Sequence, residues 1–346
     1  MRIYLVSYQS LMLNRGGPTY KLLHLKTALQ NLGVDVRFFD MWDANMKLGK
    51  ADLVHIFNAG IATYSLAANL IAYGSKYVVN PIFYSNHSAG LLRTYQKLNN
   101  LCNKLLMRSY SDYGLTKYVC DQAKMVLPNT MAEGELLQKG LGVNPGKIQE
   151  IANGVEKRFA DADPDLFIQK YGLMDFILYV GHLGPDRKNG RNIIKALQQI
   201  DHPSVIIADV LHNAEGEWCR NEIEKSAKIR LIEWLNHDDP LFASAYAACD
   251  TFILPTKYET PGRAALEAGL AGAKIVITPR GGTKEYFGEM ALYPDPHSVP
   301  SLKSSVEEAL NLPKTPQLSA HIMENFIWEV VAEKTKQMYL NVLEHE

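Results

Sequence analysis

Residues 252–282 read FILPTKYETPGRAALEAGLAGAKIVITPRGG. The apolar run that ends at Pro255 predicts a buried strand, and the polar turn after it carries Glu259. Gly262 then opens a predicted helix on which Glu267 lies just beyond the first turn. The free N–H groups at the start of such a helix, together with the positive end of its dipole, can hold a diphosphate. The stretch therefore predicts a strand, a loop and a helix that suit an anionic ligand.

The two glutamates of this stretch can serve two parts of one ligand. A carboxylate on the first turns of a helix can accept hydrogen bonds from a vicinal diol such as ribose, which suits Glu267. A carboxylate on the preceding loop can accept them from sugar hydroxyls, which suits Glu259. The alternative is that Glu259 is a solvated loop residue and Glu267 a helix-surface acid. The segment as a whole favours a nucleotide-sugar site.

Short β-branched and aromatic runs alternate with segments of helical period along the whole chain. The predicted strands are 3–7, 34–39, 53–57, 77–79, 125–127, 176–180, 205–208, 230–232, 251–254 and 274–278. The predicted helices include 17–32, 61–73 and 328–343. Apolar strands joined by helices indicate parallel sheets that are covered on both faces. We therefore expect an α/β protein with two doubly wound, Rossmann-like domains.

The pattern pauses in the polar stretch 156–165, which contains Asp and Pro residues and is typical of an inter-domain connection. We expect one domain over residues 1–155, completed by a C-terminal helix over 329–346. The second domain then covers residues 156–328. With 346 residues, of which 47% are hydrophobic, the chain is long enough for two such cores.

The composition argues against a nucleic-acid-binding protein and against a disulfide or zinc framework. The 36 Lys and Arg balance 37 Asp and Glu, so the chain lacks the excess positive charge of a nucleic-acid binder. The cysteines lie far apart, without metal-ligand spacing, and are expected to be free buried thiols: Cys102, Cys120, Cys219 and Cys249. The first residues lack the pattern of a signal peptide, and no segment approaches a membrane span. We expect a cytoplasmic protein without a bound metal.

Glu259 and Glu267, with Pro261-Gly262 between them and Gly281-Gly282 after the next strand, resemble the E-x7-E signature of family 4 retaining glycosyltransferases. Further matching motifs occur along the chain: Gly16-Gly17, Asp52-Leu-Val-His55, Pro128-Asn-Thr130, Asn153-Gly-Val155, Gly181-His-Leu183, Lys188-Asn189 and Trp328-Glu329. The resemblance implies the GT-B fold, in which two Rossmann-like domains face each other across a cleft. It places the acceptor on the first domain and the nucleotide sugar on the second.

The resemblance also implies a role for each matching residue. Glu267 would hold the ribose, Glu259 the donor sugar, and backbone groups around Gly262 the phosphates. The donor-binding set is completed by the neighbours Thr260, Pro261 and Arg263. Gly16 and Gly17 match the flexible glycine loop of the acceptor side, although a Gly pair between a strand and a helix also suits a tight turn.

Cations after the strand 176–180 can neutralise a diphosphate leaving group. Lys188 matches the lysine of the family, and Arg187 beside it either shares that role or faces solvent. The departure is His182, where most relatives have a phosphate-binding Arg. A neutral His can donate one hydrogen bond but lacks the fixed charge of Arg. Either Arg187 compensates for this difference, or catalysis is weakened.

The resemblance implies no cofactor beyond the donor itself, a sugar nucleotide of UDP or GDP type. The β-phosphate of the donor would deprotonate the acceptor, so that no separate base is required. His87 follows the fourth strand, where relatives often have a His near the transferred sugar, but a lone loop His also suits a structural or solvent-exposed position. Recognition of the base is expected near Trp234-Leu235.

Residues 91–110 contain Arg93, Lys97, Lys104 and Arg108 and no acidic residue. A basic amphipathic helix can lie on an anionic membrane, which would bring the enzyme to lipid-linked acceptors. The pattern also suits a helix that packs on its own domain with solvated cations, and this second arrangement is favoured.

These observations favour a glycosyltransferase that acts on a glycan or glycolipid acceptor in cell-surface polysaccharide biosynthesis. Two other functions remain open. One is a different enzyme of the same fold, such as a nucleotide-sugar epimerase. The other is a glycosyltransferase-like binding or scaffold protein, which the change at His182 would explain.

Overall fold

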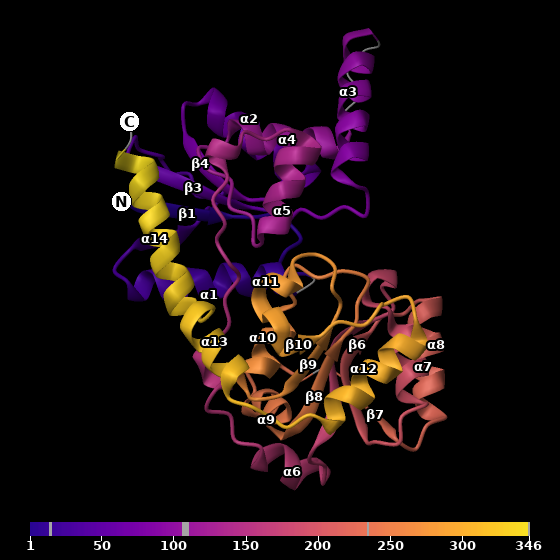
Figure 1. Cartoon of the computed structure of the whole chain (residues 1–346). Coiled ribbons are helices and arrows are strands. Elements are labelled where there is room, and N and C mark those ends of the chain that lie inside the picture. The colour runs from indigo at the N-terminus through magenta and orange to yellow at the C-terminus, as the bar shows by residue number, and fades with distance from the viewer. Residues whose placement is uncertain (14–15, 106–110, 234, 345–346) are drawn as a thin grey trace. The chain divides into compact units, whose positions relative to one another are not determined.

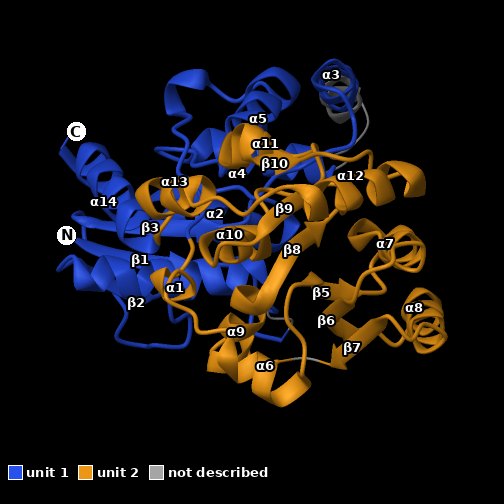
Figure 2. Cartoon of the chain, turned by 60° about the horizontal axis from the view of Figure 1, so that its bottom comes forward, with its two compact units in different colours: residues 1–154, 328–346 blue, residues 155–327 orange. Residues whose placement is uncertain are grey.

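The structure is a computed structural model that describes residues 1–13, 16–105, 111–233 and 235–344, and the side chains of this set apart from those of 100–105. The chain divides into two compact units, one of residues 1–154 with 328–346 and one of residues 155–327 (Figure 2). Each boundary lies one residue from the position that the sequence predicts.

The first unit is built on a parallel sheet of four strands in the order β2-β1-β3-β4 (Figure 1). The strands are β1 (Arg2–Val6), β2 (Asp35–Phe38), β3 (Asp52–Phe57) and β4 (Lys76–Asn80). The α-helices are α1 (Gly17–Asn31), α2 (Ile61–Ala72), α3 (Ala89–Leu105), α4 (Asp112–Gln122), α5 (Met131–Glu135) and α14 (Trp328–Glu344). A π-helical turn, η1 (Leu136–Leu141), and a 3-10 turn, η2 (Pro145–Lys147), complete the unit.

Strand β1 shows why this sheet is covered on both faces. Successive side chains of a strand point to opposite faces, so Ile3 and Leu5 enter one core cluster while Tyr4 and Val6 enter the other. The first cluster is closed by α1, through Leu22, Leu25 and Leu29, and by α14, through Met338. The nearly continuous apolar character of the strand is therefore required by burial on both sides.

The second unit has a parallel sheet of six strands in the order β10-β9-β8-β5-β6-β7. The strands are β5 (Phe176–Leu183), β6 (Ser204–Val210), β7 (Ile229–Glu233), β8 (Cys249–Leu254), β9 (Lys274–Ile277) and β10 (Ala291–Leu292). The α-helices are α6 (Asp165–Tyr171), α7 (Gly190–Leu197), α8 (Ala214–Glu224), α9 (Pro240–Ala248), α10 (Arg263–Leu270), α11 (Thr283–Phe287), α12 (Val299–Asn311) and α13 (Gln317–Asn325). The 3-10 turns are η3 (Lys157–Phe159), η4 (Asp186–Lys188) and η5 (Gly288–Met290).

The predicted class of two parallel-sheet α/β domains is confirmed, and two strand predictions need correction. Residues 125–127 do not form a strand; only Val126 bridges to Val79 and to Ile148. Pro128 follows this short run and has no N–H group with which to extend a ladder. Strand β10, of two residues, was not predicted because so short a segment shows no periodicity.

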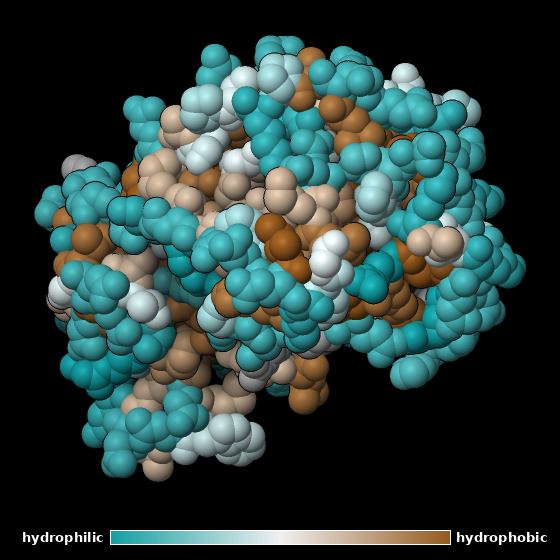
Figure 3. All heavy atoms as spheres, turned by 90° about the horizontal axis from the view of Figure 1, so that it is seen from below, coloured by the Kyte–Doolittle hydropathy of each residue, from teal (hydrophilic) through white to brown (hydrophobic). Residues whose placement is uncertain are grey.

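Three of the four cysteines, Cys120, Cys219 and Cys249, are buried and free, as expected; the side chain of Cys102 lies outside the described set. None of the helices in the described ranges has the length and apolar character needed to cross a membrane. Hydrophilic residues predominate on the face of the molecule drawn in Figure 3, and hydrophobic residues appear there in smaller areas.

Two contacts tie α14 into the first unit. The Nδ1 atom of His55, in β3, lies 2.6 Å from the hydroxyl of Tyr339, and both side chains are buried. At the start of the helix, Trp328 packs on Gly154 so closely that a Cβ atom on this glycine would lie 2.4 Å from the indole ring. Glycine at position 154 is therefore required by packing.

We predict that Gly154→Ala lowers the free energy of unfolding by about 1–3 kcal/mol, the usual cost of overpacking a core. The control is Gly90→Ala in α3, where no atom lies within 4 Å of the added Cβ. Alanine suits a helix better than glycine, so this control is expected to lose no stability. Denaturant unfolding of both variants is the measurement, and equal midpoints for the two would contradict the packing argument.

Candidate functional site

The loop from Pro255 to Gly262 connects β8 to α10 and carries Glu259. It ends on Gly262, the N-cap of α10, which has a φ of 90°. A Cβ atom at this position would lie 3.0 Å from Leu254 and 3.1 Å from Ile277. Glycine is required here both by the left-handed backbone and by the close approach of the two strand ends.

A second glycine brings the loop after β9 against Glu259. Gly281 has a φ of 95°, and a Cβ atom on it would lie 2.1 Å from the carbonyl oxygen of Glu259. In addition, the Glu259 N–H donates to the carbonyl of Arg280 at 3.0 Å. The Gly281-Gly282 pair noted in the sequence therefore holds the backbone of Glu259 in place.

The Glu259 carboxylate is buried and carries two cations on one oxygen. Its Oε1 atom lies 2.8 Å from Lys188 Nζ and 3.0 Å from Arg187 Nη1. Burial by itself would raise the pKa of Glu259, but the charges of Lys188 and Arg187 outweigh it and hold this pKa below the usual value. Glu259 is therefore an ionised, paired carboxylate, and a solvated loop position is excluded.

Both cations come from η4, the turn between β5 and α7. Arg187 does not face solvent freely: its Nη1 also donates to the Tyr258 carbonyl at 3.1 Å. Its own carbonyl accepts from the N–H of Lys257 at 2.9 Å. Burial lowers the pKa of Lys188, and its pairing with Glu259 opposes that effect. The turn and the loop thus share one charged cluster.

Asn189 fixes the position of this turn. Its φ is 60°, a left-handed conformation that Asn tolerates better than most residues. Its buried side-chain amide donates to the Pro255 carbonyl at 2.8 Å and to the Pro296 carbonyl at 2.7 Å. The sequence contains Asn189 within a family motif, but no local signal reveals these two partners.

Glu267 lies on α10 and is almost fully buried, so the alternative of a helix-surface acid is excluded. Its Oε1 lies 3.0 Å from His237 Nε2 and 3.2 Å from Arg263 Nε, and its Oε2 accepts from the Tyr246 hydroxyl at 2.9 Å. Burial opposes ionisation, yet Arg263 and His237 lower the pKa of Glu267 to about 2.

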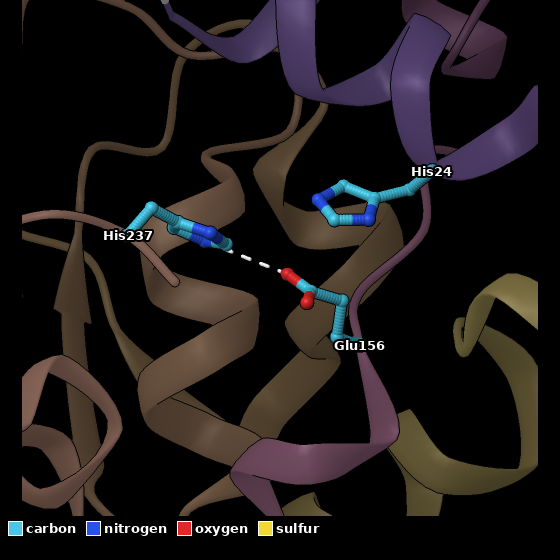
Figure 4. Close-up of side chains that lie close together, drawn as sticks. All are labelled: His24, Glu156 and His237. Atoms are coloured by element: carbon cyan, nitrogen blue, oxygen red, sulfur yellow. Dashed lines mark ion pairs between the residues drawn. The ribbon is translucent and has the colours of Figure 1, made fainter. Parts of the chain in front are cut away.

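His237 and Tyr246 are partners of Glu267 that sequence reasoning missed. His237 lies just before α9, which has Asp239 as its N-cap and Pro240 as its first residue. Its imidazole also lies beside Glu156, with Nε2 and Oε2 3.6 Å apart (Figure 4). The contact with Glu267 joins residues 30 positions apart, and only the packing of α9 against α10 brings them together.

His182 is placed near the cations but does not join their cluster. It lies in β5, where its backbone carbonyl accepts from the Tyr179 hydroxyl at 3.0 Å. Its Nε2 is 3.9 Å from a carboxylate oxygen of Asp209. Burial, with a contribution from the Lys188 charge, lowers its pKa, so His182 is neutral at neutral pH. The two cations that pair with Glu259 are therefore Lys188 and Arg187, and His182 is not one of them.

The remaining candidate residues differ in burial and in backbone conformation. Thr260 is half-buried, and Pro261 is buried in the loop before α10. In the first unit, Gly16 is the N-cap of α1 with an extended backbone (φ −162°), and Gly17 is the first helical residue. Neither has a positive φ, so a strained turn does not explain this glycine pair. His87 is exposed on the loop after β4; Trp234 lies outside the described residues.

Part of the second unit matches a known protein family. Residues 167–325, which contain Lys188, Glu259 and Glu267, match the family model "Glycosyl transferases group 1". This segment is therefore similar to group 1 glycosyl transferases. Among curated proteins, the glycogen synthase of Mycobacterium tuberculosis (strain CDC 1551 / Oshkosh) is 30% identical over 175 residues, 47% of this chain and 42% of that protein.

A second curated relative is the O-antigen chain mannosyltransferase B of Escherichia coli. It is 27% identical over 150 residues, which are 41% of this chain and 39% of the relative. The chain therefore spans less than half the length of each of these two relatives.

Solved structures match the whole chain. The sucrose-phosphate synthase (tll1590) from Thermosynechococcus elongatus superposes with a TM-score of 0.75 at 17% identity, over 100% of both chains. A glycosyltransferase from Rickettsia africae ESF-5 has a TM-score of 0.73 at 14% identity, over 99% of this chain and 98% of that one. At this level of identity the similarity shows the fold alone, and the fold of this chain is GT-B.

We predict that Glu267 makes stability depend on pH in acid. Its pKa lies below the unfolded value of 4.5, so ionised Glu267 stabilises the fold above about pH 4.5, and this contribution is lost as pH falls toward about 2. Its full size is about 3 kcal/mol. The destabilisation of Glu267→Gln relative to the unmodified protein, measured by denaturant unfolding, should shrink from pH 7 to pH 3. A difference that stays constant over this range would refute the assignment.

Proposed function

We propose that this chain is a retaining glycosyltransferase that moves a sugar from a nucleotide-diphosphate sugar onto a glycan or glycolipid acceptor. The observation that carries the proposal is the cluster formed by Glu259, in the loop before α10, and by Arg187 and Lys188 of η4, all within the segment that matches the group 1 family model. The Anabaena Alr3699/HepE structures, which are complexes with UDP and with UDP-glucose, support a donor of the UDP type. A GDP sugar has the same diphosphate and ribose.

The charges of the cluster suit the departure of a diphosphate. As the glycosidic bond breaks, negative charge develops on the leaving group, and Lys188 and Arg187 are fixed beside its expected position. Glu259 holds both cations in place and accepts hydrogen bonds from the hydroxyls of the donor sugar. The β-phosphate of the donor takes the proton of the acceptor hydroxyl, so the reaction needs neither a metal nor a separate carboxylate base. The configuration of the transferred sugar is retained.

The biological setting is a further part of the proposal. One relative is an O-antigen mannosyltransferase, and the similar structure of WaaG is a glycosyltransferase involved in lipopolysaccharide biosynthesis. We therefore propose a role in cell-surface polysaccharide biosynthesis, with the protein in the cytoplasm and the acceptor site on the first unit near Gly16, Gly17 and His87.

Arg187→Ala and Lys188→Ala should each lower kcat/KM about 10²-fold or more, because each removes a charge that stabilises the leaving group. The control is Lys257→Ala, since Lys257 pairs with the exposed Asp186 instead of Glu259. His182→Ala should cost less than Arg187→Ala. The measurement is NMR of reactions with UDP and GDP sugars and glycan acceptors, in which free nucleotide diphosphate and the anomeric configuration of the product are both observed.

The same spectra separate the alternatives. An isomerised donor without released nucleotide diphosphate would identify an epimerase and refute the transferase. If calorimetry detected no binding of any nucleoside diphosphate and Glu267→Ala changed nothing, the chain would be a scaffold protein. Equal losses for Lys257→Ala and Lys188→Ala would refute the role of the cluster.

We also propose that α3 makes a peripheral membrane contact. In the described part of this helix, Leu91, Tyr95 and Leu98 are exposed while Leu92 is buried, and Figure 1 shows α3 standing out from the rest of its unit. Exposed apolar residues next to Arg93 and Lys97 suit an anionic lipid surface. The cations Lys104 and Arg108 lie outside the described side chains.

Co-sedimentation with vesicles that contain anionic lipid is the test of this contact. The unmodified protein should sediment with these vesicles, and binding should weaken with salt because the attraction is electrostatic. A variant with Arg93, Lys97, Lys104 and Arg108 changed to Glu should remain in solution. If the two proteins sediment equally, the membrane contact is wrong and the helix serves its own domain.

A further inference from the structure

The Glu267 carboxylate has few acceptor positions left for a ligand. An ionised carboxylate offers about four lone-pair positions, two on each oxygen. Among the described residues, His237 Nε2 and Arg263 Nε approach Oε1 at 3.0 and 3.2 Å, and the Tyr246 hydroxyl approaches Oε2 at 2.9 Å. About one position, on Oε2, remains for a hydroxyl of a bound molecule, and its direction depends on how these donors hold the carboxylate.

Arg158 determines which nitrogen of His237 carries the proton. The Arg158 Nη2 atom lies 3.3 Å from His237 Nδ1 and 2.7 Å from the backbone carbonyl of the same residue. A guanidinium group can only donate hydrogen bonds, so Nδ1 must accept. With Nδ1 accepting, Nε2 carries the ring proton that is donated to Glu267.

The position of Arg158 and the orientation of the His237 ring are both fixed. Arg158 Nε donates to Glu156 Oε1 at 2.9 Å. The imidazole is buried between aromatic side chains, with ring centroids 5.1 Å from Phe242 and 5.8 Å from Phe159. The ring cannot turn without displacing these neighbours, so it presents Nε2–H to Glu267 in one direction.

We propose that His237 is a positioning residue: as a donor with a fixed tautomer, it orients the Glu267 carboxylate so that Oε2 accepts a ribose hydroxyl of a nucleoside diphosphate. This inference rests on the proposed function, because it takes the ribose to be the ligand of Glu267. Arg158 acts indirectly, because its contact with Nδ1 fixes the tautomer of His237. The chain Arg158, His237, Glu267 thereby connects the segment at the start of the second unit to ribose recognition.

Two substitutions of His237 test whether the Nε2 donor itself is needed. Both replace the imidazole with an amide, and only one of them brings a donor to Glu267. In His237→Gln, the amide nitrogen can reach the place of Nε2 and still donate to Glu267. In His237→Asn, the shorter side chain ends near the place of Nδ1, so it can accept from Arg158 but cannot reach Glu267. Both variants are neutral and polar, and thermal unfolding verifies that both are folded.

The measurement is calorimetric binding of UDP, ADP and GDP, and of the 2′,3′-dideoxy analogue of whichever binds most tightly. The unmodified protein should prefer the ribose form by about tenfold to a hundredfold, the usual strength of a hydrogen bond to a charged group. His237→Gln should keep this preference. His237→Asn and Glu267→Ala should reduce it to about twofold or less.

The outcomes distinguish ribose binding by Glu267 from the positioning role of His237. If Glu267→Ala loses the ribose preference and His237→Asn keeps it, Glu267 binds ribose as proposed and the inference about His237 is wrong. Loss of the preference in both His237→Asn and His237→Gln would likewise overturn the role of the Nε2 donor. If no nucleoside diphosphate binds to the unmodified protein, the proposed function fails and the inference fails with it.

Discussion

The candidate site depends on one buried ion cluster, in which a single oxygen of Glu259 holds Lys188 and Arg187. A buried carboxylate such as Glu259 would be strongly unfavourable without such partners, and its two partly buried cations would likewise lose their anion. The cluster therefore requires that the turn η4 and the loop before α10 be held together. In the proposed reaction, the same two cations become available to a diphosphate, so the interaction that stabilises the ligand-free site also prepares it for an anion.

The backbone around this cluster is shaped by residues that carry no charge. Gly281 lets the chain after β9 touch the backbone of Glu259, and Gly262 lets α10 begin between two strand ends. Asn189 fastens the turn that carries the cations to two backbone carbonyls. These positions explain why the segment between β8 and α11 is rich in glycine, and they place its two glutamates on rigid supports, as a binding site requires.

The sequence predicted the fold well because strands buried on both faces leave a visible apolar pattern, as in β1 and β8. It also singled out Glu259, Glu267 and Lys188 as candidate site residues, since these lie in motifs of fixed spacing. It could not reveal that His237, Tyr246 and Arg263 surround Glu267, or whether Arg187 pairs with Glu259 or faces solvent. Those facts depend on the packing of α9, α10 and η4 in space, and contacts between residues tens of positions apart leave no local signal. Residues 125–127 were predicted as a strand, but only Val126 forms a bridge. A short apolar run does not by itself specify how a segment pairs with neighbouring strands.

The most direct test of the central claim is a crystal structure of the protein with a bound nucleoside diphosphate. The account predicts that Lys188 and Arg187 contact the phosphate oxygens, that Gly262 lies against the diphosphate, and that Glu267 accepts a hydrogen bond from the ribose. A nucleotide bound elsewhere, with Glu259 and its two cations unchanged and distant from every phosphate, would contradict it.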